Sequence, residues 1–481
     1  MRTFLFLLCL IGSGPASAQI HFSGFISGIA DENLILEYPS DLFGTVRTKE
    51  LPVIDNRFSY NMDLATSGTI KLSYKDKDRS IFVWKGSDSL HISFDADFLD
   101  DSITIDGAAG PIWALIDGIN HRFGSRLSVT WLEEQAADAT NIDAMEMDAF
   151  RLRNDVVHGI GLHEGQLPTG FVSGYRNHLG YYYYLSLFKF SSVKTAHSRI
   201  PKATEIPQVL LEGLDWERMN RSSELDSEFF RELLLEYVDH MALSEYDFMK
   251  FQDKDAAVQE AFNQARAHLK DAALSYFLTA TMLRNAEQVR PSLLRQMHTH
   301  LKQQKDAEEF VPLVEERIGE RLKAEDDEQP VAVTEEQAEN DLLHIEVDGL
   351  DGKKFFLSEL KGKVIYLDIW ASWCGPCRKQ FPAAKALKAQ LTKKEKKNIV
   401  FLYISIDNTE TVWKMAIEQL GIKGVHGLSK GGWGSEVTAK FGVRSIPRYL
   451  IFDRKGKAVD QNAPRPSDPN LPGILRKLAA Q

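Results

Sequence analysis

Cysteine is scarce in this sequence: three occur in 481 residues, Cys9, Cys374 and Cys377. A secreted protein held together by disulfides carries more cysteines, distributed along the chain, and the loop between Cys374 and Cys377 is too small to stabilise much. A structural zinc site needs about four ligands, and no pattern brings histidines to this pair. We therefore expect no disulfide framework and no metal. We interpret the cysteine pair as a reactive site rather than as a structural element.

Long hydrophobic runs are also missing, except for a short one at the N-terminus. The apolar run Phe4–Ile11 follows Arg2 and precedes Ala16-Ser17-Ala18, a pattern typical of a secretory signal peptide. The run is well short of the roughly 20 residues that span a bilayer, which disfavours the alternative of an uncleaved anchor. We predict a signal peptide over residues 1–18, cleaved after Ala18, and an exported soluble protein.

The net charge of −11 is unevenly distributed. Residues 341–481 contain 24 Lys and Arg against 14 Asp and Glu, whereas the first 340 residues carry 33 against 54. Residues 325–340 include a proline, many acids and no basic residue, which is the composition of an exposed linker. We expect a new domain from residue 341, and hypothesise that this basic domain docks on the acidic upstream region, within or between chains.

Two periodicities divide the upstream part of the chain. Residues 19–107 alternate apolar and polar side chains, as in Ser89–Phe98, which predicts a β-rich domain of antiparallel strands. Residues 108–324 space apolar residues three and four apart, as in Glu228–Leu243, which predicts an α-helical domain. We interpret the aromatic run Gly180–Phe190 as helix core, with an aromatic wall for peptide binding as the alternative.

Residues 341–481 alternate strands and helices. Continuous apolar strands end at Trp370 and span Asn398–Asp407, a helix covers Glu410–Gly421, and Arg448–Val459 forms a hairpin. Buried strands with intervening helices predict an α/β domain with a sheet covered on both faces. The predicted fold class is therefore multidomain, with β-rich, α-helical and α/β domains in that order.

The cysteine pair falls where a strand gives way to a helix. Cys374 is expected at the helix N-terminus, where free N–H groups and the helix dipole favour a thiolate. Pro376 suits the first helical turn, and Cys377 lies one turn further on the same face. The outer thiolate can attack a substrate disulfide, and the inner thiol can then resolve the mixed disulfide.

The segment VIYLDIWASWCGPCRKQFP resembles the active-site segment of thioredoxin-fold proteins. The longer stretch GKKFFLSELKGKVIYLDIWASWCGPC resembles more narrowly the exported thiol–disulfide reductases of the TlpA/ResA kind, and GVRSIPRYLIFDRKGKAV carries their Ile-Pro ahead of a strand. The upstream layout is similar to that of long TlpA-like proteins from Bacteroidetes-type bacteria. The resemblance implies a thioredoxin-like domain over residues 341–481 and thiol–disulfide exchange without a cofactor.

The resemblance also implies roles for single residues. Cys374 is the nucleophile and Cys377 the resolving thiol, and together they form the redox disulfide. Pro447 is expected to be a cis-proline facing the pair, and Ile446 to offer backbone hydrogen bonds to an extended substrate peptide. Trp373 is expected to flank the thiolate as an apolar platform, with simple packing as the alternative.

Asp368 lies six residues before Cys374, inside an apolar strand where burial should raise the pKa of its carboxyl group. In thioredoxins an acid at this position helps to move the proton of the inner cysteine, and we predict the same role here; hydrogen bonding at the strand end is the alternative. Tyr403 stands where thioredoxins commonly have a lysine partner to this acid. Gln380 replaces a glutamate common in ResA-like proteins, which places more of the proton transfer on Asp368.

Three other functions are alternatives to a reductase. A peroxidase of the same fold needs a hydroxyl residue just ahead of its reactive cysteine, where this chain has Ala371. An oxidase or isomerase suits an oxidising compartment, although Gly-Pro between the cysteines favours a low, thioredoxin-like reduction potential. A client-binding scaffold with an appended redox domain is compatible with the enzyme.

We predict periplasmic reduction of protein disulfides. The expected partners are disulfide-containing client proteins and a membrane electron donor, with no nucleic acid, and a homo-oligomer is left open.

Overall fold

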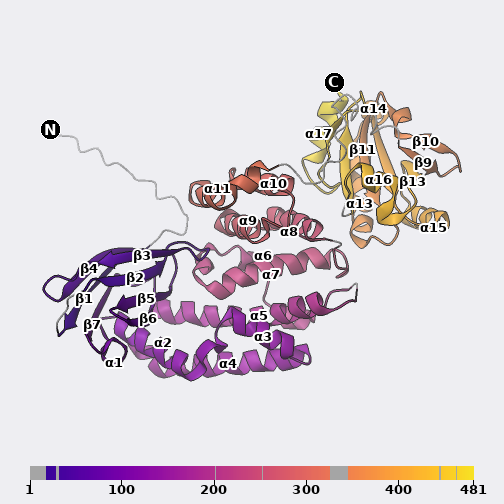
Figure 1. Cartoon of the computed structure of the whole chain (residues 1–481). Coiled ribbons are helices and arrows are strands. Elements are labelled where there is room, and N and C mark those ends of the chain that lie inside the picture. Colours follow the sequence, from indigo (N-terminus) through magenta and orange to yellow (C-terminus); the bar gives the residue numbers. More distant parts are fainter. Residues whose placement is uncertain are drawn as a thin grey trace, which may run out of the picture. The chain divides into compact units, whose positions relative to one another are not determined.

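The computed structural model describes residues 18–28, 32–200, 202–251, 253–324, 345–443, 446–461 and 463–480 (Figure 1). Residues 1–17 of the predicted signal peptide and the predicted linker 325–340 lie outside this described part. Contacts divide the chain into two compact units. The second comprises Ala242–Glu260, Gln288–Ser292 and Ala324–Gln481, and the first holds the rest.

The first unit begins with two four-stranded sheets, whose strand orders are β4-β1-β7-β8 and β3-β2-β5-β6. The strands are β1 (Ala18–Ser27), β2 (Leu34–Pro39), β3 (Val46–Leu51), β4 (Arg57–Leu64), β5 (Gly68–Tyr74), β6 (Lys77–Val83), β7 (Ser89–Asp95) and β8 (Thr104–Asp106). Neighbours are antiparallel as expected, except that β1 and β7 pair in parallel. Alternate residues such as Ile20 and Phe22 are fully buried, and both sheets contribute to one apolar core.

Helices make up most of the chain after these strands, and the first of them lies between β7 and β8. They are α1 (Leu99–Ser102), α2 (Ala109–Phe123), α3 (Val129–Asp138), α4 (Ile142–His163), α5 (Thr169–His197), α6 (Trp216–Met219), α7 (Glu228–Ser244), α8 (Lys254–His268), α9 (Asp271–Asn285), α10 (Pro291–Leu301) and α11 (Ala307–Lys323). Ser128 and Asn141 cap α3 and α4 by accepting backbone hydrogen bonds, as these residue types favour. The aromatic run lies in α5, where Tyr181, Tyr182 and Phe188 are buried. The interpretation of this run as helix core is therefore confirmed.

The second unit contains a seven-stranded sheet of order β10-β9-β13-β12-β11-β14-β15 (Figure 1). Its strands are β9 (Glu346–Gly349), β10 (Lys354–Phe356), β11 (Val364–Trp370), β12 (Ile399–Ser405), β13 (Val425–Leu428), β14 (Arg448–Phe452) and β15 (Ala458–Asp460). Its helices after residue 345 are α13 (Gly375–Gln390), α14 (Lys393–Asn398), α15 (Glu410–Leu420), α16 (Glu436–Lys440) and α17 (Leu471–Ala479).

Two neighbouring strands form the centre of this sheet. All seven residues of β11 and all seven of β12 are buried, and the two strands run parallel. A parallel pair needs a crossover connection, and α13 lies in that connection. The cysteine pair at the start of α13 is thus carried by the most buried strand pair of the second unit. No helix in the described part of the chain is both long and apolar enough to cross a membrane.

Candidate active site

The chain leaves β11 at Trp370, turns, and enters α13 at Gly375. Cys374 is the N-cap residue, and its Sγ accepts a hydrogen bond of 3.1 Å from the backbone N–H of Cys377. Pro376 occupies the first turn, where a missing N–H costs nothing. The Cys377 N–H and the dipole at the helix N-terminus favour the thiolate of Cys374 when the pair is reduced.

Cys374 and Cys377 are joined as a disulfide with a Cα–Cα distance of 5.3 Å. Cys374 is 3% exposed and Cys377 is fully buried. The outer sulfur is therefore the one that a client can approach.

A cis peptide bond lies at the same edge of the sheet as the cysteine pair. It joins Ile446 to Pro447, directly before β14. Since β14 pairs antiparallel with β11 and Arg448 lies opposite Ile369, the residues before Arg448 reach the edge where β11 ends. The structure thus brings Ile446 and Pro447 to the edge from which Cys374 follows.

Exposed apolar side chains lie beside the pair. Trp373 is 55% exposed, and its ring centroid is 6.0 Å from that of Trp433. A hollow of about 260 Å³ next to Trp373 is also lined by Val412 and Met415, which are exposed as well. Sequence reasoning missed Trp433; its setting between glycines, Gly431-Gly432-Trp433-Gly434, was the available signal.

A carboxylate fixes the loop in front of Cys374. Asp407 accepts hydrogen bonds from the backbone N–H of Ser372 at 2.9 Å and from its hydroxyl at 2.7 Å. Ser405 also donates to Asp407, at 2.6 Å. This cluster ties the loop to the end of β12, and no sequence pattern had singled it out.

Asp368 lies in the interior of the sheet and is 1% exposed. Neither of its carboxylate oxygens has a hydrogen-bond partner within the described structure. Burial raises the pKa of this carboxyl group well above its ordinary value, and the charge of Lys388 opposes that rise. Tyr403 lies opposite Asp368 on the neighbouring strand β12.

Lys388 supplies a cation near this buried acid. Its Nζ donates a hydrogen bond of 2.9 Å to the hydroxyl of Tyr403 and lies 4.9 Å from the centroid of that ring. Burial lowers the pKa of Lys388 to about 8, and Asp368 counteracts the decrease. Tyr403 occupies the position where thioredoxins commonly have a lysine, and in this chain Lys388 of α13 is hydrogen-bonded to that tyrosine.

Sequence reasoning missed Lys388, although a signal was present. Cys377, Phe381, Ala384 and Lys388 follow one another at intervals of four, three and four residues, which places them on one face of a helix. A lysine on a face that is otherwise buried indicates a specific partner, because a buried ammonium group is costly without one.

Comparisons with known proteins agree with this geometry. Residues 329–475 match the family model described as Redoxin. Thiol-disulfide oxidoreductase ResA of Bacillus thuringiensis (strain Al Hakam) is 31% identical over 132 residues, which cover 27% of this chain and 73% of that relative. ResA of Bacillus anthracis matches with the same identity and coverage.

The chain belongs to the ResA/TlpA-like thiol-disulfide oxidoreductases. The family resemblance and the thioredoxin-like nature of the C-terminal region are thereby confirmed. Among solved structures, the thioredoxin domain of a thiol-disulfide oxidoreductase from Bacteroides vulgatus is 24% identical, with a TM-score of 0.25. The match covers 28% of this chain and 92% of that structure.

This oxidoreductase differs from the family pattern at Gln380. The Gln380 side-chain oxygen accepts a hydrogen bond of 3.3 Å from the backbone N–H of Ser467. An amide cannot titrate, so Gln380 holds the segment around Ser467 and takes no part in moving protons.

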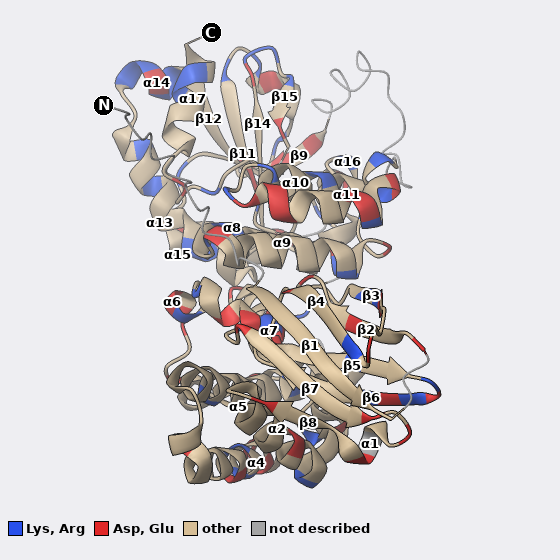
Figure 2. Ribbon diagram, turned by 90° about the vertical axis from the view of Figure 1, so that its left-hand side faces the viewer, with Lys and Arg blue, Asp and Glu red and all other residues tan. Residues whose placement is uncertain are grey.

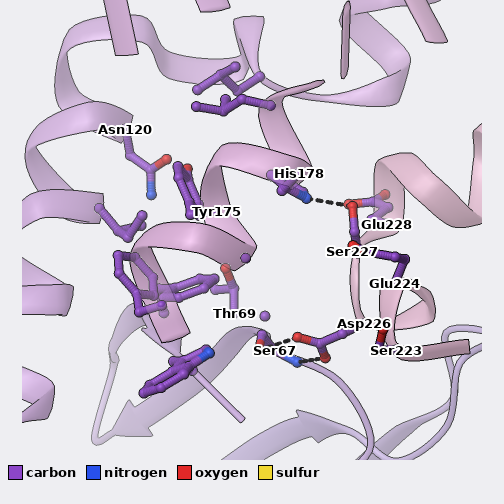
Figure 3. Close-up of a pocket in the computed structure, with 18 residues that line it drawn as sticks. Ser67, Thr69, Asn120, Tyr175, His178, Ser223, Glu224, Asp226, Ser227 and Glu228 are labelled. Atoms are coloured by element: carbon purple, nitrogen blue, oxygen red, sulfur yellow. Dashed lines mark hydrogen bonds between the residues drawn. The ribbon is translucent and has the colours of Figure 1, made fainter. Parts of the chain in front are cut away.

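The ResA-like oxidoreductase has a separate cavity of about 270 Å³ in its first unit (Figure 3). Part of its wall is aromatic and is formed by Trp84, Phe171 and Tyr175. Asp226, which also lines the cavity, accepts hydrogen bonds of 2.7 Å from the backbone N–H and the hydroxyl of Ser67. His178 hydrogen-bonds to Ser227. The described lining contains no cysteine, lysine or arginine, and its polar groups are hydroxyls, amides, carboxylates and an imidazole.

Substituting Lys388 in this oxidoreductase tests its link to Asp368. Because the ammonium group opposes the raised pKa of Asp368, Lys388→Met should raise that pKa further. The rise of the thiol–disulfide exchange rate with pH should then occur at higher pH, and the rate at pH 7 should fall by roughly threefold to tenfold, the effect of one partly screened charge. The measurement is a pH–rate profile for both proteins.

Lys385→Met is the matched control. Lys385 lies one turn earlier on α13, is exposed and makes no described contact with Tyr403. If both variants shift the profile equally, the effect belongs to the general charge of the helix and not to Lys388.

Proposed function

We propose that this protein reduces disulfides of client proteins in the periplasm through the Cys374–Cys377 pair. The observation that carries the proposal is the pair itself: a Cys-Gly-Pro-Cys motif with Cys374 as N-cap of α13 and Cys377 buried one turn later. The thiolate of Cys374 attacks a client disulfide, a mixed disulfide forms, and one client sulfur leaves as thiolate. Cys377 then attacks Cys374, which releases the reduced client and regenerates the disulfide of the enzyme.

The surroundings of the pair supply the other roles. Asp368 is the proton acceptor for Cys377, since it is the buried acid on the strand that leads to the pair. Ile446 offers its backbone to an extended client segment beside cis-Pro447, and Trp373 provides apolar surface. The carboxylate–lysine arrangement of Asp368 and Lys388 sets the pH at which the resolving step becomes efficient.

The compartment follows from the N-terminal signal-peptide pattern, and the electron supply follows from the compartment. An exported reductase is oxidised in each catalytic cycle, so a membrane electron donor has to return two electrons to the pair. Clients are disulfide-containing proteins of the same compartment. The acidic character of the upstream region and the basic character of residues 341–481 support docking between them as a further hypothesis.

The reduction potential of the Cys374–Cys377 pair is the deciding measurement. We expect a value near the thioredoxin end of the scale, roughly −270 mV, in equilibrium with dithiothreitol or glutathione. A value near the DsbA end, about −120 mV, would instead make the protein a disulfide donor.

A further inference from the structure

A large groove lies on the C-terminal domain, and neither cysteine is among its lining residues. It is lined by α13, by α14, by β12 and by the loop Gly421–Val425, and its volume is about 810 Å³. Ligand-binding pockets of proteins typically measure roughly 300–1,000 Å³. The groove is therefore large enough for a small organic molecule.

The charged residues that line this groove all have the same sign. Its lining includes five basic residues and no acidic residue: Arg378, Lys385, Lys388, Lys396 and Lys423. None of the five forms an ion pair within the described chain. In Figure 2, blue segments of the ribbon mark lysine and arginine positions along α13 and α14. Lys388 also interacts electrostatically with the buried Asp368, but the lining itself holds no acid, so the groove favours the binding of an anion.

The walls between these cations are apolar. Phe381, Leu391, Phe401 and Ile422 line the groove and are buried in the domain. Lys388 lies over two of the lining rings, with its Nζ 5.2 Å from the Phe401 centroid and 4.9 Å from the Tyr403 centroid. The groove thus combines an apolar interior with basic groups.

We propose that this groove binds an amphiphilic anion: a hydrocarbon or aromatic body that carries one carboxylate, phosphate or sulfonate group. The body covers the small part of the apolar wall that the groove leaves open to water, and the anionic group pairs with the lysines. A purely hydrophilic anion leaves the walls wet, and a neutral apolar molecule leaves the cations unpaired. Both therefore bind more weakly than a molecule with both features.

The test uses octanoate as the probe and the full mature protein with its disulfide intact. Octanoate, octanol and octylammonium have the same hydrocarbon chain and differ in charge. Isothermal titration should give the tightest binding for octanoate, with octylammonium at least about tenfold weaker because its charge is repelled. Amide NMR shifts caused by octanoate should map to α13, β12 and the loop Gly421–Val425.

Matched variants locate the site. Lys396→Gln and Lys423→Gln each remove an exposed cation of the groove and should weaken octanoate binding by about twofold to fivefold. Lys397→Gln removes the neighbouring charge on α14, which does not line the groove, and should change the affinity by less than about twofold. All three replace exposed side chains, so the fold is retained.

Three outcomes would overturn the proposal. Equal affinity for octanoate and octylammonium would show that charge plays no part, and an equal loss in Lys397→Gln and Lys396→Gln would show diffuse attraction only. Binding of an Asp- and Glu-rich peptide in place of octanoate would assign the groove to a protein partner. Binding is measured on the oxidised pair, so its result is independent of whether the protein reduces clients.

Discussion

Replacing Cys374 with serine should reduce client-disulfide reduction to the uncatalysed background. Serine is not ionised at neutral pH and cannot form the mixed disulfide, so the first exchange step is lost. Cys377→Ser should behave differently, because the nucleophile at the N-cap of α13 remains. It should accumulate a covalent complex with its client, visible on a non-reducing gel and released by dithiothreitol.

The third cysteine offers the control. Cys9 lies in the predicted signal peptide, so Cys9→Ser should leave the mature enzyme with unchanged activity. A mixed disulfide that accumulates in Cys374→Ser and not in Cys377→Ser would reverse the two roles. Identification of the proteins trapped by Cys377→Ser would also name the clients.

Asp368→Asn should slow client reduction by about 100-fold at neutral pH, within the usual range for losing a general acid–base group. Asparagine has nearly the same shape but cannot accept the proton of Cys377. The measurement is a single-turnover rate for resolution of a mixed disulfide, monitored by release of the client thiol. An unchanged rate would exclude Asp368 as the proton acceptor.

The same substitution should also change how stability depends on pH. The free energy of unfolding of Asp368→Asn, compared with that of the wild type, should increase as pH rises. Burial raises the pKa of Asp368 in the folded state, so the unfolded state releases this proton at lower pH than the folded state does. The wild type therefore loses stability as pH rises through the interval between these two pKa values, by up to about 1.4 kcal/mol per pH unit. The asparagine side chain of the variant cannot titrate, so the variant does not share this loss.

Urea unfolding at several pH values between about 4 and 8 measures this effect, because the interval starts near the ordinary pKa of an aspartate. Burying the asparagine amide has a cost that does not depend on pH. The pH dependence of the difference in unfolding free energy between variant and wild type therefore reports only the titration of the Asp368 carboxyl group. If the difference in unfolding free energy between variant and wild type stays constant over this pH interval, Asp368 is ionised in the folded protein.

Local patterns predicted the features of the active site that depend on neighbours in sequence. The apolar strand ending at Trp370, the helix start at Cys374 and the burial of Asp368 follow from residue types that lie within a few positions of one another. The end of α15 was also predictable from a local signal, because Gly421 adopts the left-handed conformation that terminates helices.

Features that join distant segments could not be predicted in the same way. Lys388 reaches Tyr403 on the next strand, and Ser372 is held by Asp407 across the sheet edge. Such contacts depend on how the helix packs against the strand, and the local pattern of apolar and polar residues does not determine that packing. The parallel pairing of β1 with β7 was missed for the same reason, since the two strands are far apart in sequence.

The strand that leads to the cysteines has one further consequence, for the choice of clients. β11 is hydrogen-bonded to β12 on one side and to β14 on the other, and all seven of its residues are buried. Its amides should exchange with solvent only when the whole domain unfolds, so the backbone behind Cys374 is rigid on the time scale of catalysis. We therefore expect much of the conformational adjustment needed for attack to come from the client. Disulfides in frayed or incompletely folded segments should react faster than those in well-packed domains, so folding intermediates are the clients we expect to react fastest.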